Sequence, residues 1–143
     1  MTCVFCESEE IKKREIIRTD LVRVFPTNIP VVPGHLLICP VRHVAKFEEL
    51  TNEEILEIQK ITARLVSALK LVYGAEGFNY AWNEAKVAGQ SVPHFHLHML
   101  PRKEGDTGIY EYEPRKFLYR PGSREESPQA ELVAVSKEIK KFL

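Results

Sequence analysis

The 143-residue sequence lacks any long apolar segment, and it lacks an excess of charge of either sign. No apolar run approaches the ~18 residues that a membrane-spanning helix requires. Twenty Lys and Arg residues balance twenty Asp and Glu residues, whereas a nucleic-acid-binding domain usually carries a basic face. We therefore expect neither a membrane nor a nucleic acid as partner. Residues 1–6 lack the basic and apolar regions of a signal peptide, which predicts a cytoplasmic location.

Cysteine is also scarce, and the three that are present are an odd number. An odd count does not fit a disulfide framework, and a cytoplasmic protein keeps its thiols reduced. The sequence shows no internal repeat, low-complexity tract or linker before its last thirty residues. Because a single domain typically has ~100–150 residues, we expect residues 1–143 to form one domain, with a variable C-terminal segment from about residue 104.

The apolar periodicity predicts one long helix at about residues 51–73. Thr51 and Glu54 have the spacing of a capping box before it, and Gly74 is a natural stop after it. A second helix is expected from about residue 127 to 142. Short β-type runs are expected at residues 14–19, 21–25, 35–40, 78–83 and 94–100. Because helices and strands are segregated along the chain, the predicted class is α+β with an antiparallel sheet of about five strands.

The five histidines are His35, His43 and three that alternate with Phe and Leu at residues 94–98. In an extended chain the three point to one face, and the apolar residues between and after them point into the core. They could be exposed polar positions on an amphipathic strand. They could share one metal ion, although His94 and His98 would lie ~13 Å apart on a straight strand. The third interpretation is nucleophilic or acid–base chemistry, which suits an imidazole with a pKa near ~6.5.

The segment His94-Phe95-His96-Leu97-His98-Met99-Leu100 resembles the signature of the histidine-triad proteins. Pro33-Gly34-His35 and Ala88-Gly89-Gln90-Ser91 are similar to further elements of that family. Leu100-Pro101-Arg102-Lys103 is nearer to the fragile-histidine-triad, dinucleoside polyphosphate hydrolase-like branch. The resemblance covers the chain from its N-terminus to about residue 103. It implies the histidine-triad fold and a homodimer, in which the long helix and a sheet edge meet their two-fold mates.

The resemblance also implies an enzyme that hydrolyses nucleoside phosphoanhydrides or phosphoramidates, or transfers the nucleotide. His96 would attack the α-phosphate and form a nucleotidyl-histidine intermediate, and water would then release a nucleoside monophosphate. The other ring nitrogen of His96 would donate to a backbone carbonyl near His94, and His35 would support the triad from behind. The alternative function is a nucleotide-binding signalling module with incidental catalysis, and a third is a zinc-organised interaction protein.

Four further residues receive roles from the same resemblance. His98, Gln90 and Asn83 would contact phosphate oxygens, and Ser91 would assist the leaving group. Without the neighbouring histidines, ordinary loop polarity would explain Asn83, Gln90 and Ser91 equally well. Gln90 favours water as the acceptor, because the phosphorylase branch generally lacks glutamine at this position.

The sequence departs from the family where ribose is usually bound. The family has an acidic residue or Asn eight positions before His35, whereas this chain has Thr27 followed by Asn28. Either residue could contact a ribose hydroxyl or serve only in a turn. Phe5, Phe25 and Ile38 are candidates for an apolar base pocket or for simple core packing.

Cys3 and Cys6 have the spacing of half a tetrahedral zinc site. Many microbial histidine-triad proteins are similar in this pair, and the resemblance completes the ligand set with His43 and His94. A closed Cys₂His₂ set binds zinc structurally, so no cofactor is expected for the chemistry itself. The alternative is two unpaired thiols near a frayed terminus. Cys39 lies in an apolar run and is predicted to belong to the core.

The segment at residues 105–122 interleaves aromatic and basic residues. It could cover the substrate and contact a polyphosphate tail, or it could be a solvated loop. Because branches of the family differ most after the triad, this region is expected to influence the second substrate group.

Overall fold

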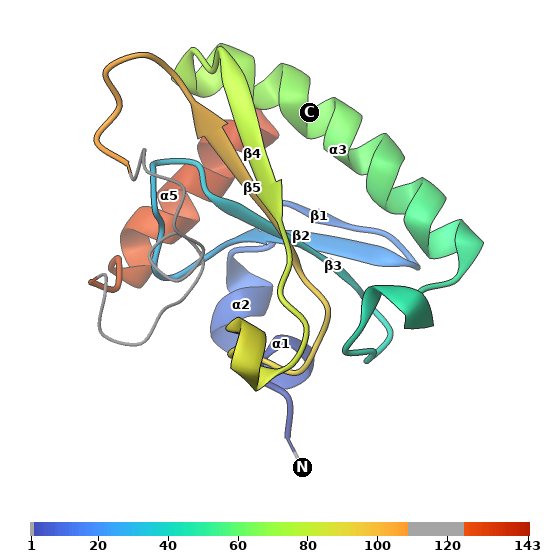
Figure 1. The fold of residues 1–143 in the computed structure, drawn as a ribbon. Helices are drawn as coiled ribbons and strands as arrows, with labels where there is room; N and C mark the ends of the chain where they lie inside the picture. The colour runs from blue at the N-terminus through green and yellow to red at the C-terminus, as the bar shows by residue number, and fades with distance from the viewer. Residues whose placement is uncertain (1, 109–124) are drawn as a thin grey trace.

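A computed structural model describes residues 2–108 and 125–143 (Figure 1). The described part consists of a sheet, four α-helices and two short 3-10 helices. In chain order the elements are α1 Val4–Glu7, α2 Glu9–Lys13, β1 Ile17–Arg18, β2 Val22–Pro26, β3 Leu36–Pro40, η1 Phe47–Glu49, α3 Asn52–Tyr73, β4 Gly77–Ala81, η2 Lys86–Ala88, β5 Leu97–Arg102 and α5 Gln129–Lys140.

The sheet has five strands in the order β1-β2-β3-β5-β4, and every neighbouring pair is antiparallel. The predicted α+β class with about five antiparallel strands is therefore confirmed. β5 lies between β3 and β4, with His98 paired to Leu37 on one side and to Ala81 on the other. The strand that carries the last histidine of the motif is thus held by neighbours on both edges.

The long helix α3 is fixed at both ends by its own sequence. The Thr51 hydroxyl accepts the Glu54 N–H at 3.1 Å, and the Glu54 carboxylate accepts the Thr51 N–H at 2.9 Å. Gly74 ends the helix with φ at 66°, a left-handed conformation that favours glycine. Leu65 and Leu69 are fully buried on the inner side of the helix. The predicted long helix is confirmed, with Thr51 as its capping residue.

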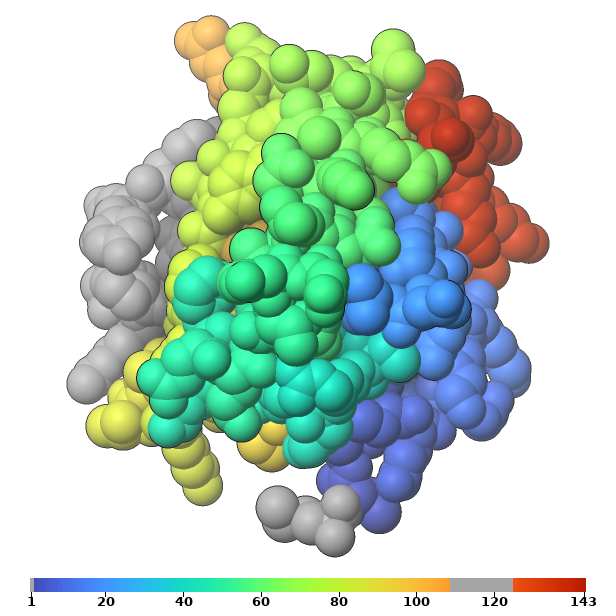
Figure 2. All heavy atoms as spheres, turned by 90° about the vertical axis from the view of Figure 1, so that its right-hand side faces the viewer, coloured from blue at the N-terminus to red at the C-terminus, as the bar shows by residue number. Residues whose placement is uncertain are grey.

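The two faces of the sheet carry different side chains. Val24 and Ile38 belong to the main apolar core with α3, whereas Phe25 and Leu37 pack with residues of α1 and α2. Figure 1 shows α3 on one side of the sheet and the two short N-terminal helices on the other. Figure 2 shows α3 spread across its own face with α5 at the flank, and Ile139 of α5 joins the same core. The alternating histidines of residues 94–98 lie on the second face, beside α1 and α2.

The two N-terminal helices were not predicted, and they alter the first expected strand. Ser8 caps α2 by accepting the Ile11 N–H at 3.3 Å. Arg14 is the residue after α2, where its buried side chain donates to the Pro26 carbonyl at 3.0 Å. The strand predicted for residues 14–19 is therefore wrong at its start, and only β1 remains.

The remaining boundaries differ by a few residues from the predicted ones. β4 ends at Ala81 instead of residue 83, and β5 begins at Leu97, so the first two histidines precede the strand. The predicted second helix is confirmed as α5. Most of the segment at residues 105–122 lies outside the described residues. None of the helices described combines the length and the apolar character needed to cross a bilayer.

Candidate functional site

The three alternating histidines are buried. His94, His96 and His98 are 0%, 4% and 2% exposed, so the interpretation as exposed polar positions is wrong. Phe95 and Met99 lie in apolar clusters on the opposite side, as the alternation predicts. Buried polar groups require hydrogen-bond partners, and the partners present here determine what each imidazole can do.

His96 has a defined tautomer. Its Nδ1–H donates to the backbone carbonyl of His94 at 2.8 Å, so Nε2 carries the lone pair. The ring of Phe5, from α1, meets His96 edge to face with the ring centres 5.0 Å apart. His96 also lines a cavity, so the arrangement fits an imidazole nucleophile whose orientation is fixed from two sides.

His35 and His98 form a hydrogen-bonded pair next to His96, and the direction of the bond can be assigned. The Val31 N–H donates to His35 Nδ1 at 3.1 Å, which leaves the proton of His35 on Nε2. That Nε2–H donates to His98 Nδ1 at 2.9 Å. A neutral His98 therefore carries its own proton on Nε2, and its ring centre lies 5.0 Å from that of His96. The pair can present a hydrogen-bond donor beside the nucleophile, as stabilisation of a phosphate oxygen requires.

The cavity beside His96 has a volume of about 470 Å³ and is formed by segments from both ends of the chain. The apolar part of its wall includes Phe5 and Phe25, two of the three candidates for the base pocket, and both also pack in an apolar cluster. Leu37 is the contributing residue of β3, whereas the third candidate, Ile38, lies in the opposite core. Ser91 lines the cavity together with His96. The remaining wall comes from residues 4–14, Thr27, Asn28, Val92 and residues 126–132.

Gln90 and Asn83 are engaged within their loop. The Gln90 side chain donates to the Ala45 carbonyl at 2.9 Å and accepts the Ala85 N–H at 2.9 Å. The Asn83 amide donates to the Gly89 carbonyl at 3.3 Å. Ala85 has φ at 68°, so the Gln90 contact helps to hold a conformation that non-glycine residues rarely adopt. Neither side chain belongs to the cavity wall, and their predicted contacts with phosphate stay predictions.

Thr27 and Asn28 both line the cavity. The Thr27 hydroxyl accepts the Ile29 N–H at 3.3 Å, which is the turn chemistry expected of a threonine in this loop. The Asn28 amide donates to the Glu126 carboxylate at 3.2 Å. The loop thus contacts Glu126, which also lines the cavity.

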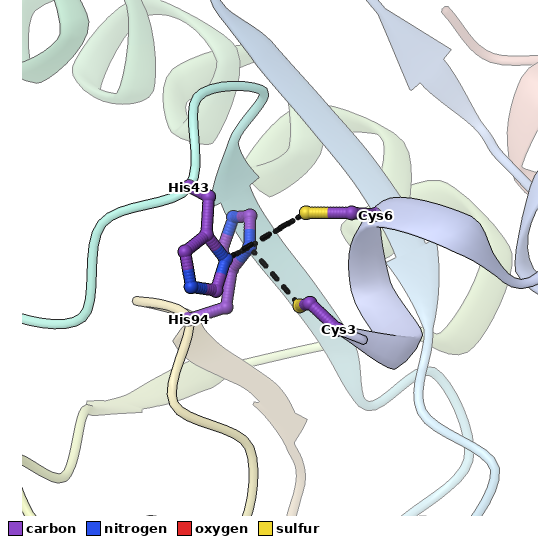
Figure 3. Close-up of side chains that lie close together, drawn as sticks. All are labelled: Cys3, Cys6, His43 and His94. Carbon is purple, nitrogen blue, oxygen red and sulfur yellow. Dashed lines mark hydrogen bonds between the residues drawn. The ribbon is translucent and has the colours of Figure 1, made fainter. Parts of the chain in front are cut away.

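Cys3, Cys6, His43 and His94 converge on one point, as Figure 3 shows. The His94 Nδ1 atom lies 3.6 Å from Cys3 Sγ, 3.5 Å from Cys6 Sγ and 3.2 Å from His43 Nδ1. The distance from Cys6 Sγ to His43 Nδ1 is 3.7 Å. Tetrahedral zinc separates a sulfur from a nitrogen ligand by about 3.5 Å and two nitrogens by about 3.3 Å. The cluster can therefore hold a metal ion with tetrahedral coordination.

The protonation of this cluster also suits a metal. His94 Nε2–H donates to the Pro40 carbonyl at 2.8 Å, so Nδ1 faces the cluster as a lone pair. Burial lowers the pKa of His94, and His43 and Arg23 lower it further against the opposing bond to Pro40. Burial and the neighbouring Cys3 raise the pKa of the Cys6 thiol, so metal binding would release a proton.

Two arginines near the site were not predicted. Arg23 is buried under α1, where it donates to the Phe5 carbonyl and pairs with Glu15. Arg14 lines the cavity and donates to Gln129 at 3.0 Å. Nothing in the local sequence distinguishes these two from surface arginines, because their partners come from distant segments.

The buried histidines, the cavity and the five-stranded sheet together define a histidine-triad protein, and comparisons agree. The HIT domain model matches residues 8–105. The bis(5'-adenosyl)-triphosphatase of Dictyostelium discoideum is 30% identical over 131 residues, covering 91% of this chain and 85% of that protein. The adenosine 5'-monophosphoramidase HNT1 of Saccharomyces cerevisiae is 32% identical over 109 residues, covering 75% of this chain and 66% of that protein.

The chain therefore belongs to the HIT domain family. A solved structure of a Zn-bound histidine triad family protein from Mycobacterium smegmatis has the same fold, with a TM-score of 0.72 at 23% identity. That match covers 99% of this chain and 93% of the other. Family membership and the histidine-triad fold were both predicted from the sequence, and both are confirmed.

Proposed function

We propose that this chain hydrolyses nucleoside phosphoanhydrides or phosphoramidates and releases a nucleoside monophosphate. The observation that carries the proposal is the fixed tautomer of His96 at the wall of a cavity. The named relatives support the substrate class, since one is a bis(5'-adenosyl)-triphosphatase and another is an adenosine 5'-monophosphoramidase.

The reaction has two steps in this proposal. His96 Nε2 attacks the α-phosphorus, a P–N bond forms, and the bond from phosphorus to the leaving oxygen or nitrogen breaks. A leaving phosphate departs as an anion, whereas a leaving amine takes up a proton from water. Water then attacks the same phosphorus and loses one proton to solvent as the P–N bond to His96 breaks, which returns the imidazole to its neutral form. His98 donates from Nε2–H to a phosphate oxygen, and His35 fixes the tautomer that allows this. Ser91, at the cavity wall, assists the leaving group by hydrogen bonding.

Gln90 and Asn83 have a supporting role in this scheme. Both shape the loop that carries Ser91, and Gln90 does so through two backbone bonds of 2.9 Å. The Gln90 amide would make the predicted contact if a phosphate oxygen replaced the Ala45 carbonyl as its acceptor. Their direct contact with phosphate is therefore tied to a rearrangement of this loop on binding.

The test is turnover of diadenosine triphosphate, diadenosine tetraphosphate and an adenosine phosphoramidate, with His96→Asn protein alongside. We expect the wild-type protein to release AMP from at least one of them. After rapid quenching at neutral or alkaline pH, mass spectrometry should find an adenylyl group on the peptide that contains His96. AMP release that persists in His96→Asn would contradict the mechanism. Binding without turnover of any substrate would favour the signalling module instead.

We also infer that the metal of the Cys3, Cys6, His43 and His94 cluster is zinc. Two thiolates and two imidazoles form a closed tetrahedral set of the kind that zinc occupies structurally. The Zn-bound Mycobacterium smegmatis protein has the same fold. Bound there, the ion would tether α1 to the segment that precedes β5, and no catalytic step requires it.

The proposed assembly is a homodimer that forms at β4. Within the described residues β4 is an edge strand, and exposed aromatic side chains lie on and beside it. Tyr80 and Trp82 are 45% and 42% exposed, and Trp82 stacks on exposed Phe47. An uncovered edge with apolar side chains favours pairing with a second copy. Light scattering should give twice the chain mass, and Tyr80→Lys with Trp82→Lys should give the monomer mass.

The predicted division into one domain and the predicted cytoplasmic location stay proposals. Cys3, Cys6 and Cys39 are all free thiols, which supports a reducing compartment.

A further inference from the structure

Part of the cavity wall lies outside the segment that matches the HIT domain. The match ends at residue 105, whereas Glu126, Ser127, Gln129 and Leu132 all line the cavity beside His96. These residues belong to the start of α5 and the segment just before it. The C-terminal segment therefore completes a site whose reacting groups come from the family domain.

Hydrogen bonds fix this segment to the body of the protein. The Ser127 N–H donates to the Asn28 carbonyl at 2.8 Å. The Gln129 side chain donates to the Glu10 carbonyl at 2.8 Å and accepts from Arg14 at 3.0 Å. Further along α5, the Ser136 hydroxyl donates to the Arg14 carbonyl at 2.7 Å. Contacts with Asn28, Glu10 and Arg14, which all line the cavity, thus set the position of this segment.

Glu126 places a carboxylate at the cavity, held by the Asn28 amide at 3.2 Å. The only other carboxylate among the described lining residues is Glu10, which lies 3.9 Å from Lys13 and so is paired with a cation. Thr27 has its hydroxyl engaged by the Ile29 N–H. A carboxylate offers two oxygens to hydrogen-bond donors, and one oxygen of Glu126 can remain with Asn28 while the other accepts from a ligand.

We propose that Glu126 accepts hydrogen bonds from the 2'- and 3'-hydroxyls of the substrate's ribose and so selects ribonucleotides over deoxyribonucleotides. The inference rests on the proposed function, because it needs a nucleoside in this cavity. Two neighbouring hydroxyls can donate to one carboxylate, whereas a sugar that lacks either hydroxyl donates only once. Asn28 positions the carboxylate, and the apolar walls at Phe5, Phe25 and Leu37 remain for the base.

The experiment measures the affinity of the purified protein for AMP, 2'-deoxy-AMP and 3'-deoxy-AMP by calorimetry. AMP is the expected product, so it binds without reacting. The variant is Glu126→Ala, and the matched control is Glu125→Ala, which removes an exposed carboxylate that does not line the cavity. Because Glu126 is exposed, its removal should leave folding unchanged, which circular dichroism can verify.

We expect the wild-type protein to bind AMP more tightly than either deoxy analogue. Glu126→Ala should weaken AMP binding by about ten- to hundredfold, as loss of a bond to a charged group implies, and leave the analogues much less affected. Asn28→Ala should move the affinities in the same direction by less, and Glu125→Ala should match the wild type.

Two results would overturn the inference alone: AMP binding with no ribose preference, or a Glu126→Ala variant that weakens all three nucleotides equally. The second result would mean that Glu126 shapes the cavity without contacting the sugar. A wild-type protein that binds no adenine nucleotide and hydrolyses none of the dinucleotides would instead contradict the proposed function.

Discussion

The two faces of the sheet are built from the same strands but hold together by different means. On the α3 face, Val24, Ile38 and Leu65 belong to one apolar core. On the other face, His96 and His98 are equally buried, and each depends on a specific hydrogen-bond acceptor or donor. Apolar contacts contribute stability in proportion to area, whereas hydrogen-bonded imidazoles contribute a defined proton position. The comparison predicts that mutations on the two faces affect different properties.

The largest expected effect is on the histidine face and concerns rate alone. His96→Asn should reduce kcat/KM by roughly 10⁴- to 10⁶-fold, because removal of a nucleophile leaves only binding and electrostatic stabilisation. The melting temperature should stay within a few degrees of the wild type, since Asn can still donate to a nearby carbonyl. Steady-state kinetics and thermal unfolding measure the two quantities. A large loss of stability in His96→Asn would contradict the claim that the two faces affect different properties.

Removal of a metal ligand should lower the stability of the protein, because the variant loses the free energy of metal binding. Cys6→Ser should abolish stoichiometric zinc, measured by elemental analysis of the purified protein, and should expose the N-terminal segment to proteases. If free metal stands at a thousand times its Kd, the wild-type protein gains about 4 kcal/mol that the variant lacks. Cys39→Ala is the control, because Cys39 lies outside the cluster. Stoichiometric zinc in Cys6→Ser would contradict the assignment of the ligands.

A mutation in the core on the α3 face should lower stability and leave the catalytic rate unchanged. Leu65 is fully buried, so Leu65→Ala should lower the free energy of unfolding by about 2–5 kcal/mol through lost contacts and a cavity. Urea denaturation gives this value. The kcat of the fraction that remains folded should stay close to that of the wild type. A strong fall in kcat at full occupancy of the native state would show that the two faces are coupled.

The smallest expected effect is at the start of α3 and depends on pH. Burial alone would raise the pKa of Glu54, but bonds from Arg42 and Thr51 outweigh it and hold the pKa below its usual value near 4.5. The ionised form is therefore favoured by folding, and its contribution is complete above pH 4.5 and is lost as the pH falls through the lower folded value. Glu54→Gln should cost about 1 kcal/mol at pH 7 and less in acid. Equal costs at pH 7 and pH 3 would refute this.

The features predicted most accurately are those that depend on residues close together in the sequence. Thr51, Glu54 and Gly74 define α3 locally, and the alternation at residues 94–98 determines which side chains share a face. The cysteine spacing and the family resemblance together predicted a cluster that the geometry brings within 4.8 Å.

The remaining features depend on contacts between distant segments. The helices α1 and α2 have only four and five residues, too few for an apolar period to appear. Arg14 was assigned to a strand because its partners, at residues 26 and 129, cannot be inferred from its neighbours. The role of Glu126 at the cavity likewise depends on a contact with Asn28, almost a hundred residues away in the sequence.

The cavity wall contains residues as far apart in the sequence as Phe5 and Leu132. This distance along the chain has a consequence for synthesis of the protein. A ribosome releases the chain from its N-terminus, so the sheet, α3 and the cysteine–histidine cluster can assemble before residues 126–132 emerge. A chain interrupted before this segment would still contain all three histidines of the motif, but the cavity beside His96 would lack the part of its wall that residues 126–132 supply. The sheet and the cysteine–histidine cluster can therefore form before the wall of the cavity is complete.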